Sequence, residues 1–237
     1  MPPKKATDQL QTTCATCALT QFCLPMGLTE RELKDLEALV KHRRIFSRGE
    51  ILHQPGDFFQ NFYAIRAGAV KSVTINTAGN EQVFGFYLPG EVIGFEAIST
   101  QKYPHSIIAL TETSICELPF THLMQMSKTH SGLQHQLLAL ASQRLTIDTC
   151  IHFTDTQQRV IAFLLNVSAR LNRSAGLKRI FDLPMSRHDI GNHLGLAMET
   201  ISRIIHHLKR QGLLAVHHRS IELLKIPALK ALATGNK

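Results

Sequence analysis

The spacing of hydrophobic residues divides the chain into a short helical start, a β-rich middle and a helical end. Thr29 and Glu32 have the spacing of a helix-capping box, and apolar residues at helical intervals follow them. Across residues 45–118 short β-branched and aromatic runs alternate with glycine-containing turn signals at intervals of roughly 7 to 12 residues. This spacing predicts an antiparallel barrel or jelly roll, and no helix of ordinary length fits between the turns.

The helical pattern returns after Pro119 and includes one long helix with two apolar faces. This helix is predicted over residues 131–152, where the only glycine lies near the start and there is no proline. A ridge with the spacing of a coiled-coil seam consists of Leu138, Ala141, Leu145 and Asp148. The other ridge consists of Leu137, Leu140 and Ile147. We expect the second ridge to face the barrel and the first to face a second copy of the chain, or else both to pack in one core.

Residues 185–214 predict two short helices joined by a tight turn. Ser186 and Asp189 form a second capping box, and Gly195 stands where a helix–turn–helix requires a glycine. The second helix is expected from near Ala197 to about Arg210. Its inward face comprises Ile201, Ile204, Ile205 and Leu208. A helix beginning at Asp155 and Gln158 and a short strand at 179–183 precede this pair, and strands at 213–216 and 220–224 are predicted to form a β-wing.

The outward face of the second helix carries Glu199, Ser202, Arg203 and His206. Arginine can bind guanine through two acceptors, glutamate can accept from cytosine, and serine suits either kind of contact. This face therefore predicts a reader of the major groove of double-stranded DNA, and an ordinary amphipathic helix pair is the alternative. Candidate phosphate contacts are Arg187, Lys209, Arg210 and Arg219.

Composition limits the class of protein. The 237 residues, 44% of them hydrophobic, suffice for one large or two modest domains. Half of the net charge of +8 lies in residues 178–219, and such a concentration of positive charge favours binding to the phosphates of nucleic acid. There is no apolar run of about 18 residues and no apolar signal-peptide core, so we expect a cytoplasmic protein with no membrane partner. In that compartment the five cysteines are expected to be thiols or metal ligands rather than disulfides.

With these elements in order, the chain resembles the CRP/FNR family of bacterial regulators, and within it the oxygen-responsive fumarate and nitrate reduction branch. The resemblance covers nearly the whole chain and is carried by Cys14-x2-Cys17-x5-Cys23 with a distant Cys116, and by YAIRAGAVKS, GFYLPGEVIGFEAI and DIGNHLGLAMETISR. It implies an α+β fold with an antiparallel jelly-roll sensor domain, a long dimerisation helix and a C-terminal winged helix–turn–helix. The expected divisions are a cysteine segment (1–28), the sensor domain (29–130), the dimerisation helix (131–152) and the DNA-binding domain (153–237), with a boundary near 150–154.

The resemblance also implies a site and a function. Cys14, Cys17, Cys23 and Cys116 are expected to ligate one oxygen-labile 4Fe–4S cluster per subunit. Base contacts fall on Glu199, Ser202 and Arg203, and the expected target is an inverted repeat of the TTGAT-N4-ATCAA type. The resemblance implies a homodimer, not an enzyme, that activates or represses anaerobic metabolism genes with RNA polymerase as a partner. No cyclic nucleotide is expected, because the run TQKYPHSIIAL after Glu96 has no arginine to bind its phosphate.

Several alternatives stay open at this point. Four thiolates also suit zinc or a thiol–disulfide switch, and the same cluster can sense nitric oxide. An iron–sulfur electron carrier or enzyme is disfavoured because the chain shows one cluster site, no nucleotide-binding glycine motif and no acid/base constellation. Cys150 has no assigned role.

Asp148 and Leu145 are candidates for a dimer switch. On a two-fold seam Asp148 would meet its own copy, and the like charges would oppose dimerisation. We hypothesise that the docked cluster offsets this repulsion, so that the dimer forms only when the cluster is intact. The alternative places Asp148 at the solvent edge of the seam.

Overall fold

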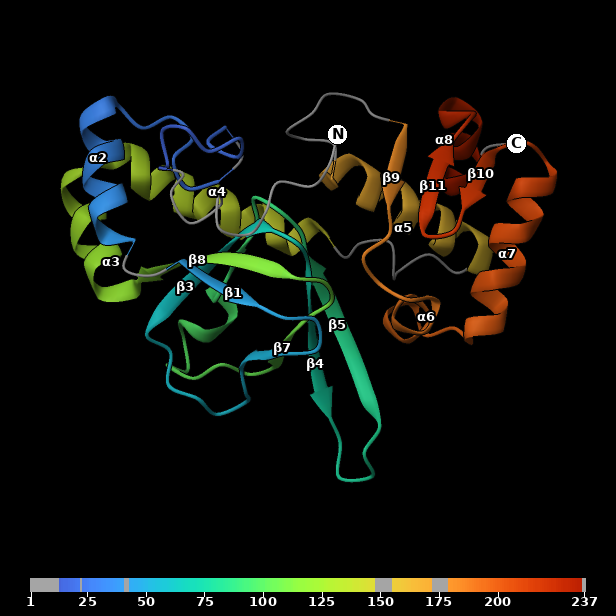
Figure 1. Cartoon of the computed structure of the whole chain (residues 1–237), viewed down its shortest axis with the longest axis horizontal. Coiled ribbons are helices and arrows are strands. Elements are labelled where there is room, and N and C mark those ends of the chain that lie inside the picture. The colour runs from blue at the N-terminus through green and yellow to red at the C-terminus, as the bar shows by residue number, and fades with distance from the viewer. Residues whose placement is uncertain (1–12, 22, 41–42, 148–154, 172–178, 236–237) are drawn as a thin grey trace. The chain divides into compact units, whose positions relative to one another are not determined.

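The structure is a computed structural model that describes residues 13–21, 23–40, 43–147, 155–171 and 179–235 (Figure 1). The chain divides into two compact units, residues 1–74 with 86–144 and residues 75–85 with 145–237. The predicted domain boundary near 150–154 lies outside the described residues, as do Asp148 and Cys150. None of the described helices is both long enough and apolar enough to cross a bilayer.

The β-rich part of the chain, residues 43–119, is built on two four-stranded sheets, as the turn spacing predicts. One sheet has the order β1 (Arg43–Phe46), β8 (Thr113–Pro119), β3 (Asn61–Ala67) and β6 (Val92–Ile93). The other has the order β2 (Ile51–His53), β7 (Ser106–Ala109), β4 (Val70–Ile75) and β5 (Glu81–Tyr87). The registered pairs are antiparallel, and the only helix within the described residues 43–119 is the single turn η1 (Phe95–Ala97). The antiparallel jelly roll is therefore confirmed.

The apolar residues that alternate along these strands fill the space between the sheets. Fully or almost fully buried members of this core are Phe46, Ile65, Val70, Ile93, Ile107 and Ile115. Cys116 follows Ile115 in β8, which lies between β1 and β3 and is hydrogen-bonded on both edges. A residue in such a strand is held firmly, because both neighbours fix its backbone.

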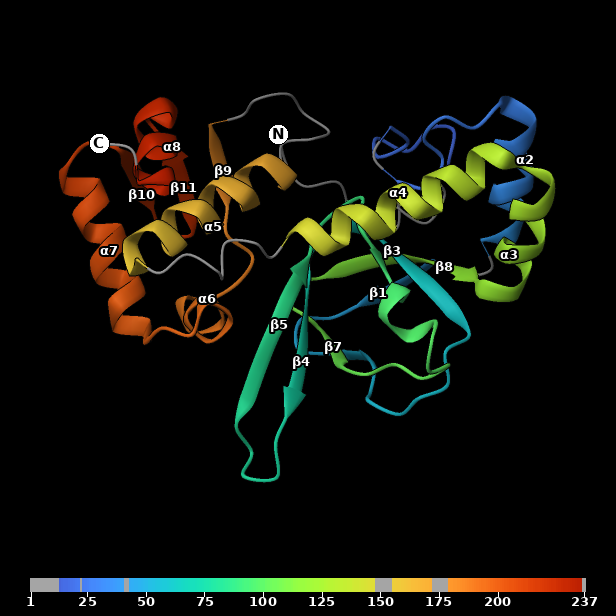
Figure 2. The same cartoon turned by 180° about the vertical axis from the view of Figure 1, so that it is seen from behind.

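Three helices accompany the jelly roll in the first unit: α2 (Glu30–Leu39), α3 (Phe120–Thr129) and α4 (Ser131–Ile147). Figures 1 and 2 show α2 beside α3 and the start of α4. The predicted capping box at the start of α2 is present, with the Thr29 hydroxyl accepting from the Glu32 N–H and the Glu32 carboxylate accepting from the Thr29 N–H. These helices share a core with the segment that follows the early cysteines, comprising Leu24, Leu36, Leu123, Leu133, Leu137 and Leu140.

The two apolar ridges predicted on α4 differ sharply in exposure. Leu137 and Leu140 are each 7% exposed and pack inward. Leu138 and Leu145 keep 65% and 85% of their surface exposed. Leu138 and Leu145 of the outer ridge are therefore exposed apolar side chains, and Ala141 between them is half-buried. The side chain of Ile147, on the inner ridge, lies outside the description.

The second unit contains the predicted winged helix–turn–helix. Its elements are α5 (Thr156–Leu171), β9 (Ile180–Asp182), α6 (Arg187–Leu194), α7 (Met198–Arg210), β10 (Leu214–His217), β11 (Ser220–Leu223) and α8 (Ile226–Thr234). The three strands form one antiparallel sheet of order β10-β11-β9. Helix α8, which the sequence analysis does not predict, packs against α5 and buries Leu229 and Ala233.

Two glycines shape the turn between α6 and α7. Gly195 ends α6 with a φ of +66°, a left-handed conformation that glycine adopts without strain. Gly191 lies one turn earlier, where an added Cβ would come within 2.5 Å of the Leu196 carbonyl oxygen. The Leu196 N–H donates to the Gly191 carbonyl across 2.8 Å. The close approach of the turn to α6 thus requires a residue without a side chain at position 191.

Candidate metal centre and DNA-binding helix

Four cysteines line one cavity in the first unit. Cys14, Cys17, Cys23 and Cys116 surround a space of about 440 Å³, part of which is open to solvent. The apolar part of the lining includes Leu19, Leu24, Pro25, Leu36 and Leu118. The structure therefore brings together all four thiols that the sequence analysis selects, although more than ninety residues separate Cys23 from Cys116.

The early cysteines are placed by a series of tight turns. The Cys17 N–H donates to the Cys14 carbonyl across 3.3 Å, and the Cys23 N–H donates to the Leu19 carbonyl across 3.0 Å. The Thr20 hydroxyl lies within hydrogen-bond distance of the Cys14 carbonyl and of the Cys17 carbonyl, the latter at 2.7 Å. These hydrogen bonds fold residues 14–23 into consecutive turns, so that the three closely spaced cysteines line the same cavity.

The fourth thiol comes from the sheet. Cys116 in β8 lies directly opposite Ala64 in β3, and residues directly opposite one another in an antiparallel pair project on the same face. The small side chain of Ala64, which also lines the cavity, leaves the space beside Cys116 open. The cavity therefore joins a rigid strand to the turns of the N-terminal segment.

Burial makes Cys23 a poor thiolate in the absence of a cation. Desolvation, the largest effect, and the nearby Cys116, Cys14 and Cys17 together raise the pKa of Cys23 from 9.0 to about 12, against a lowering effect from a backbone hydrogen bond at Leu24. A bound metal reverses this balance, because its positive charge stabilises the thiolate and releases the proton.

The four cysteine thiols are of the chemical type that binds a 4Fe–4S cluster. Thiolates are the usual ligands of 4Fe–4S clusters, and four surround this cavity. A single zinc ion would need its four sulfurs at about 2.3 Å from one point. Among the described residues, no group of three or more His, Cys, Asp or Glu side chains is gathered in that way. The four thiols line one shared space.

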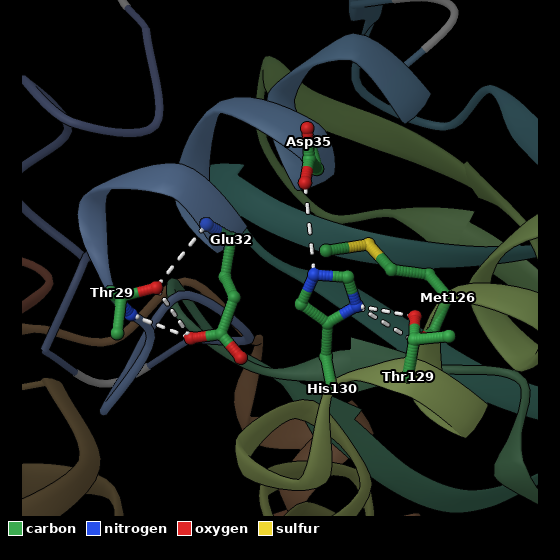
Figure 3. A network of polar contacts seen from close by, with 6 residues as sticks. All are labelled: Thr29, Glu32, Asp35, Met126, Thr129 and His130. Carbon is green, nitrogen blue, oxygen red and sulfur yellow. Dashed lines mark hydrogen bonds and ion pairs between the residues drawn. The ribbon is translucent and has the colours of Figure 1, made fainter.

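Helix α2, which follows the cysteine segment, is in polar contact with the junction between α3 and α4. A carboxylate oxygen of Asp35 in α2 lies 3.6 Å from Nε2 of His130, which lies between α3 and α4 (Figure 3). The other ring nitrogen of His130 lies 2.9 Å from the Met126 carbonyl and 2.8 Å from the Thr129 hydroxyl. Figure 3 shows this network beside the Thr29–Glu32 capping box. Sequence reasoning missed these contacts, because no local pattern links residue 35 to residue 130.

The predicted reading face of α7 is exposed. Glu199, Ser202, Arg203 and His206 all lie on the solvent side. On the opposite side Ile201, Ile205 and Leu208 are buried, and Ile204 is half-buried. The helix is thus held by its apolar face while its polar face stays free for a ligand.

The candidate phosphate contacts differ in accessibility. Lys209, Arg210 and Arg219 are exposed. Arg187 is half-buried, burial lowers its pKa, and its Nη1 is buried without a hydrogen-bond partner in the part of the chain that the structure describes. Arg187 is therefore less available to a phosphate than its position at the start of α6 suggests.

Comparisons with known proteins agree with this architecture. Residues 43–130 match the model of the cyclic nucleotide-binding domain, and residues 158–232 match the Crp-like helix-turn-helix domain. The chain is 38% identical to the transcriptional activator protein anr of Pseudomonas aeruginosa, over 95% of this chain and 94% of that protein. It is 36% identical to the fumarate and nitrate reduction regulatory protein of Escherichia coli, over 93% of this chain and 90% of that protein.

A solved structure is similar over most of the chain as well. FixK2 from Bradyrhizobium japonicum superposes with a TM-score of 0.71 at 27% identity, covering 81% of this chain and 96% of that one. The jelly roll, the helices and the C-terminal helix–turn–helix are thus found in the same combination, and the relatives are DNA-binding regulators rather than enzymes. The chain belongs to the CRP/FNR family of transcription regulators.

Proposed function

We propose that this chain is an oxygen-responsive regulator that holds one 4Fe–4S cluster on Cys14, Cys17, Cys23 and Cys116. The observation that carries the proposal is the single cavity lined by these four thiols. The similarity to the fumarate and nitrate reduction regulatory protein supports the same assignment. With the cluster bound, the chain acquires an oxygen-labile link between its N-terminal segment and the jelly roll.

The residues of the cavity have separable roles. The four thiolates bind the irons, and the leucines at positions 19, 24 and 36 limit the access of water and oxygen. Ligation joins the turns of the N-terminal segment (1–28) to residue 116 of the sensor domain (29–130), and the entropy lost on ordering that segment is offset by metal binding. Removal of the cluster therefore releases the segment.

Dimerisation along the helix 131–152 connects the cluster to DNA. Helix α4 shares its core with the cysteine segment on one side and exposes Leu138 and Leu145 on the other. A homodimer places two copies of the DNA-binding domain (153–237) on half-sites about 34 Å apart, which a monomer cannot do. Glu199, Ser202 and Arg203 read the TTGAT-N4-ATCAA repeat, and RNA polymerase is the expected partner at activated promoters in the cytoplasm.

The two members of the proposed dimer switch act in opposite directions. Leu145 contributes apolar surface to the seam, and Asp148, which lies outside the described residues, opposes association through its charge. The intact cluster offsets this repulsion by fixing the inner face of α4. Asp148→Ala is therefore expected to remain dimeric in air, and a variant as monomeric in air as the wild type contradicts this role.

Iron and sulfide content, together with a visible spectrum, tests the cluster directly. Protein purified without oxygen is expected to be brown, to carry roughly four irons per chain and to bleach in air. Dimer dissociation and loss of binding to the inverted repeat should follow over the same interval. A colourless, zinc-containing protein that is indifferent to air would overturn the cluster while leaving the DNA-binding function intact.

Titrations with nitric oxide and with cyclic AMP test which signal the protein senses. Faster cluster loss with nitric oxide than with oxygen at equal concentration would identify nitric oxide as the main signal instead. Cyclic AMP is expected to leave DNA binding unchanged. The Glu96 carboxylate already accepts a hydrogen bond from the Gly94 N–H, 3.2 Å away, and no arginine follows in TQKYPHSIIAL.

A further inference from the structure

One arginine faces the cavity that the four thiols line. Arg66, in β3, contributes to the cavity wall together with Cys116 and Ala64. Its Nη1 is buried and has no hydrogen-bond partner among the residues that the structure describes. A buried guanidinium nitrogen that donates to nothing is costly, because it has given up water without a replacement.

A β-bulge accounts for the position of this side chain. Ala64 pairs with Cys116 and Ile65 with Ile115, but the next pair joins Ala67 to Ser114, so Arg66 is the extra residue. A bulge bends its strand and re-aims a side chain, and bulges of this kind occur beside functional sites. The irregularity thus accompanies an arginine in the wall of the cavity that Cys116 also lines.

The cavity contains nothing that neutralises Arg66 while the thiols are protonated. Its lining comprises cysteines, one threonine, one proline, aliphatic residues and Arg66 itself, and it includes no aspartate or glutamate. A cluster ligated by four thiolates carries net negative charge, since the thiolates outweigh the charge of the iron–sulfide core. The Arg66 guanidinium therefore has neither a hydrogen-bond acceptor nor a negative charge in the empty cavity, and a bound cluster would supply both.

We infer that Arg66 is the counter-charge of the cluster and that its guanidinium donates a hydrogen bond to a ligating thiolate or a cluster sulfide. This inference rests on the proposed function. Hydrogen bonds to the sulfurs and nearby charge are known to set the stability and potential of such clusters. Arg66 thereby stabilises the bound state and disfavours the empty state, which shifts the equilibrium toward an occupied cavity.

Three variants test this role on the full chain. Arg66→Met removes the charge and the donor, and Arg66→Lys keeps the charge without the planar fork. Arg48→Met is the matched control, because Arg48 is an exposed arginine of the same jelly roll. Each protein is loaded without oxygen with ferric iron, sulfide and a thiol reductant, and the loss of iron to a chelator is then followed by the visible spectrum.

Arg66→Met is expected to lose iron about tenfold faster than the wild type, as the loss of a charge-assisted hydrogen bond predicts. Its cluster is expected to have a more negative reduction potential, because less positive charge stabilises the reduced form. Arg66→Lys should lie between, and Arg48→Met should match the wild type. Equal iron retention in Arg66→Met and the wild type would overturn the inference.

The apoprotein supplies a second measurement that does not depend on the cluster. Without metal, Arg66→Met is expected to melt at or above the temperature of the wild type, because it removes an unpartnered buried donor. A lower melting temperature would show that Arg66 supports the fold instead, and would overturn its role as a counter-charge. If the wild type takes up no iron, the proposed function is overturned as well. If the wild type loads iron and Arg66→Met behaves in the same way as the wild type, only this inference is overturned.

Discussion

The side-chain amide of Gln136 donates a hydrogen bond to the main-chain carbonyl of Cys23, across 3.2 Å. Gln136 lies on the inner face of α4 and is only 6% exposed. The helix that presents the outer apolar ridge is therefore bonded directly to the backbone of a candidate cluster ligand. A displacement of Cys23 on loss of the cluster would leave a buried amide without its partner, which costs more than the bond itself contributes.

Replacement of Gln136 by leucine is expected to weaken the dependence of dimerisation on the cluster. The ratio of the dimer dissociation constants of apoprotein and loaded protein should fall about fivefold to tenfold, the equivalent of one buried hydrogen bond. Analytical ultracentrifugation measures this ratio. Gln125→Leu, at an exposed position of α3, is the control, and an unchanged ratio in Gln136→Leu would show that the bond does not couple the two sites.

Cys23→Ser is expected to abolish uptake of iron and sulfide, because a serine hydroxyl does not replace a soft thiolate ligand. Cys150→Ser should load to the level of the wild type, since the proposal assigns Cys150 no role in ligation. The iron-to-protein ratio after anaerobic reconstitution measures both. Iron uptake by Cys23→Ser equal to that of the wild type would contradict the assigned ligand set.

Leu145→Glu is expected to keep the loaded protein monomeric without affecting its fold. Leu145 is 85% exposed in the single chain, so the charge meets water in the monomer but repels its copy in a dimer. Sedimentation should show the monomer, while the urea midpoint of the apoprotein stays within error of the wild type. A stable dimer would place the interface elsewhere.

His53 makes the jelly roll sensitive to acid. Burial is the largest effect that lowers the pKa of His53 to about 4, and its ring stacks on Tyr103 with centroids 3.7 Å apart. The unfolded chain binds this proton at a higher pH than the folded chain does. The contribution of neutral His53 to the free energy of unfolding is therefore fully present above about pH 6.5, and about 3 kcal/mol of it is lost as the pH falls toward 4.

His53→Phe is expected to remove most of this acid loss, since phenylalanine cannot take up a proton and its ring can keep the stack on Tyr103. Urea unfolding at pH 7 and pH 4.5 measures the difference. His122→Phe, at an exposed position, should keep the acid sensitivity of the wild type. An equal loss of stability in His53→Phe would assign the sensitivity to other groups.

Gly191→Ala is expected to disrupt the turn between α6 and α7 and to reduce DNA binding more than tenfold, because the new Cβ would clash with the Leu196 carbonyl oxygen. Gly195→Ala meets no atom within 4 Å and carries only the strain of its φ of +66°, about 1 kcal/mol. Fluorescence anisotropy with the inverted repeat should rank the two. Stronger impairment by Gly195→Ala would contradict this reading of the turn.

Much of the fold follows from local patterns in the sequence. The capping boxes at Thr29 and Ser186, the short strands between frequent turns and the two faces of α7 each depend on residues close together in the chain. The spacing of the four cysteines and the family resemblance mark them as candidate ligands, and the structure gathers them around one cavity.

The remaining features depend on register and long-range packing. The bulge that places Arg66 arises where β3 meets β8, and nothing near residue 66 in the sequence signals it. The bond from Gln136 to Cys23 spans 113 residues. Helix α8 is short and has a proline in its first turn, so the spacing of its own apolar residues is a weak signal for a helix. Its packing against α5 is the stronger indication, and that packing is not visible in the local sequence.

The central position of Cys116 in its sheet has a consequence for the order of assembly. Strand β8 is paired on both sides by backbone hydrogen bonds that require no metal, so the jelly roll can form as soon as the chain is synthesised. Three of the four candidate ligands, by contrast, lie in turns that precede the first strand. If the cluster is bound as proposed, the folded jelly roll presents one candidate ligand before any metal arrives, and insertion of the cluster is expected to be a separate, later step that closes the N-terminal turns over it.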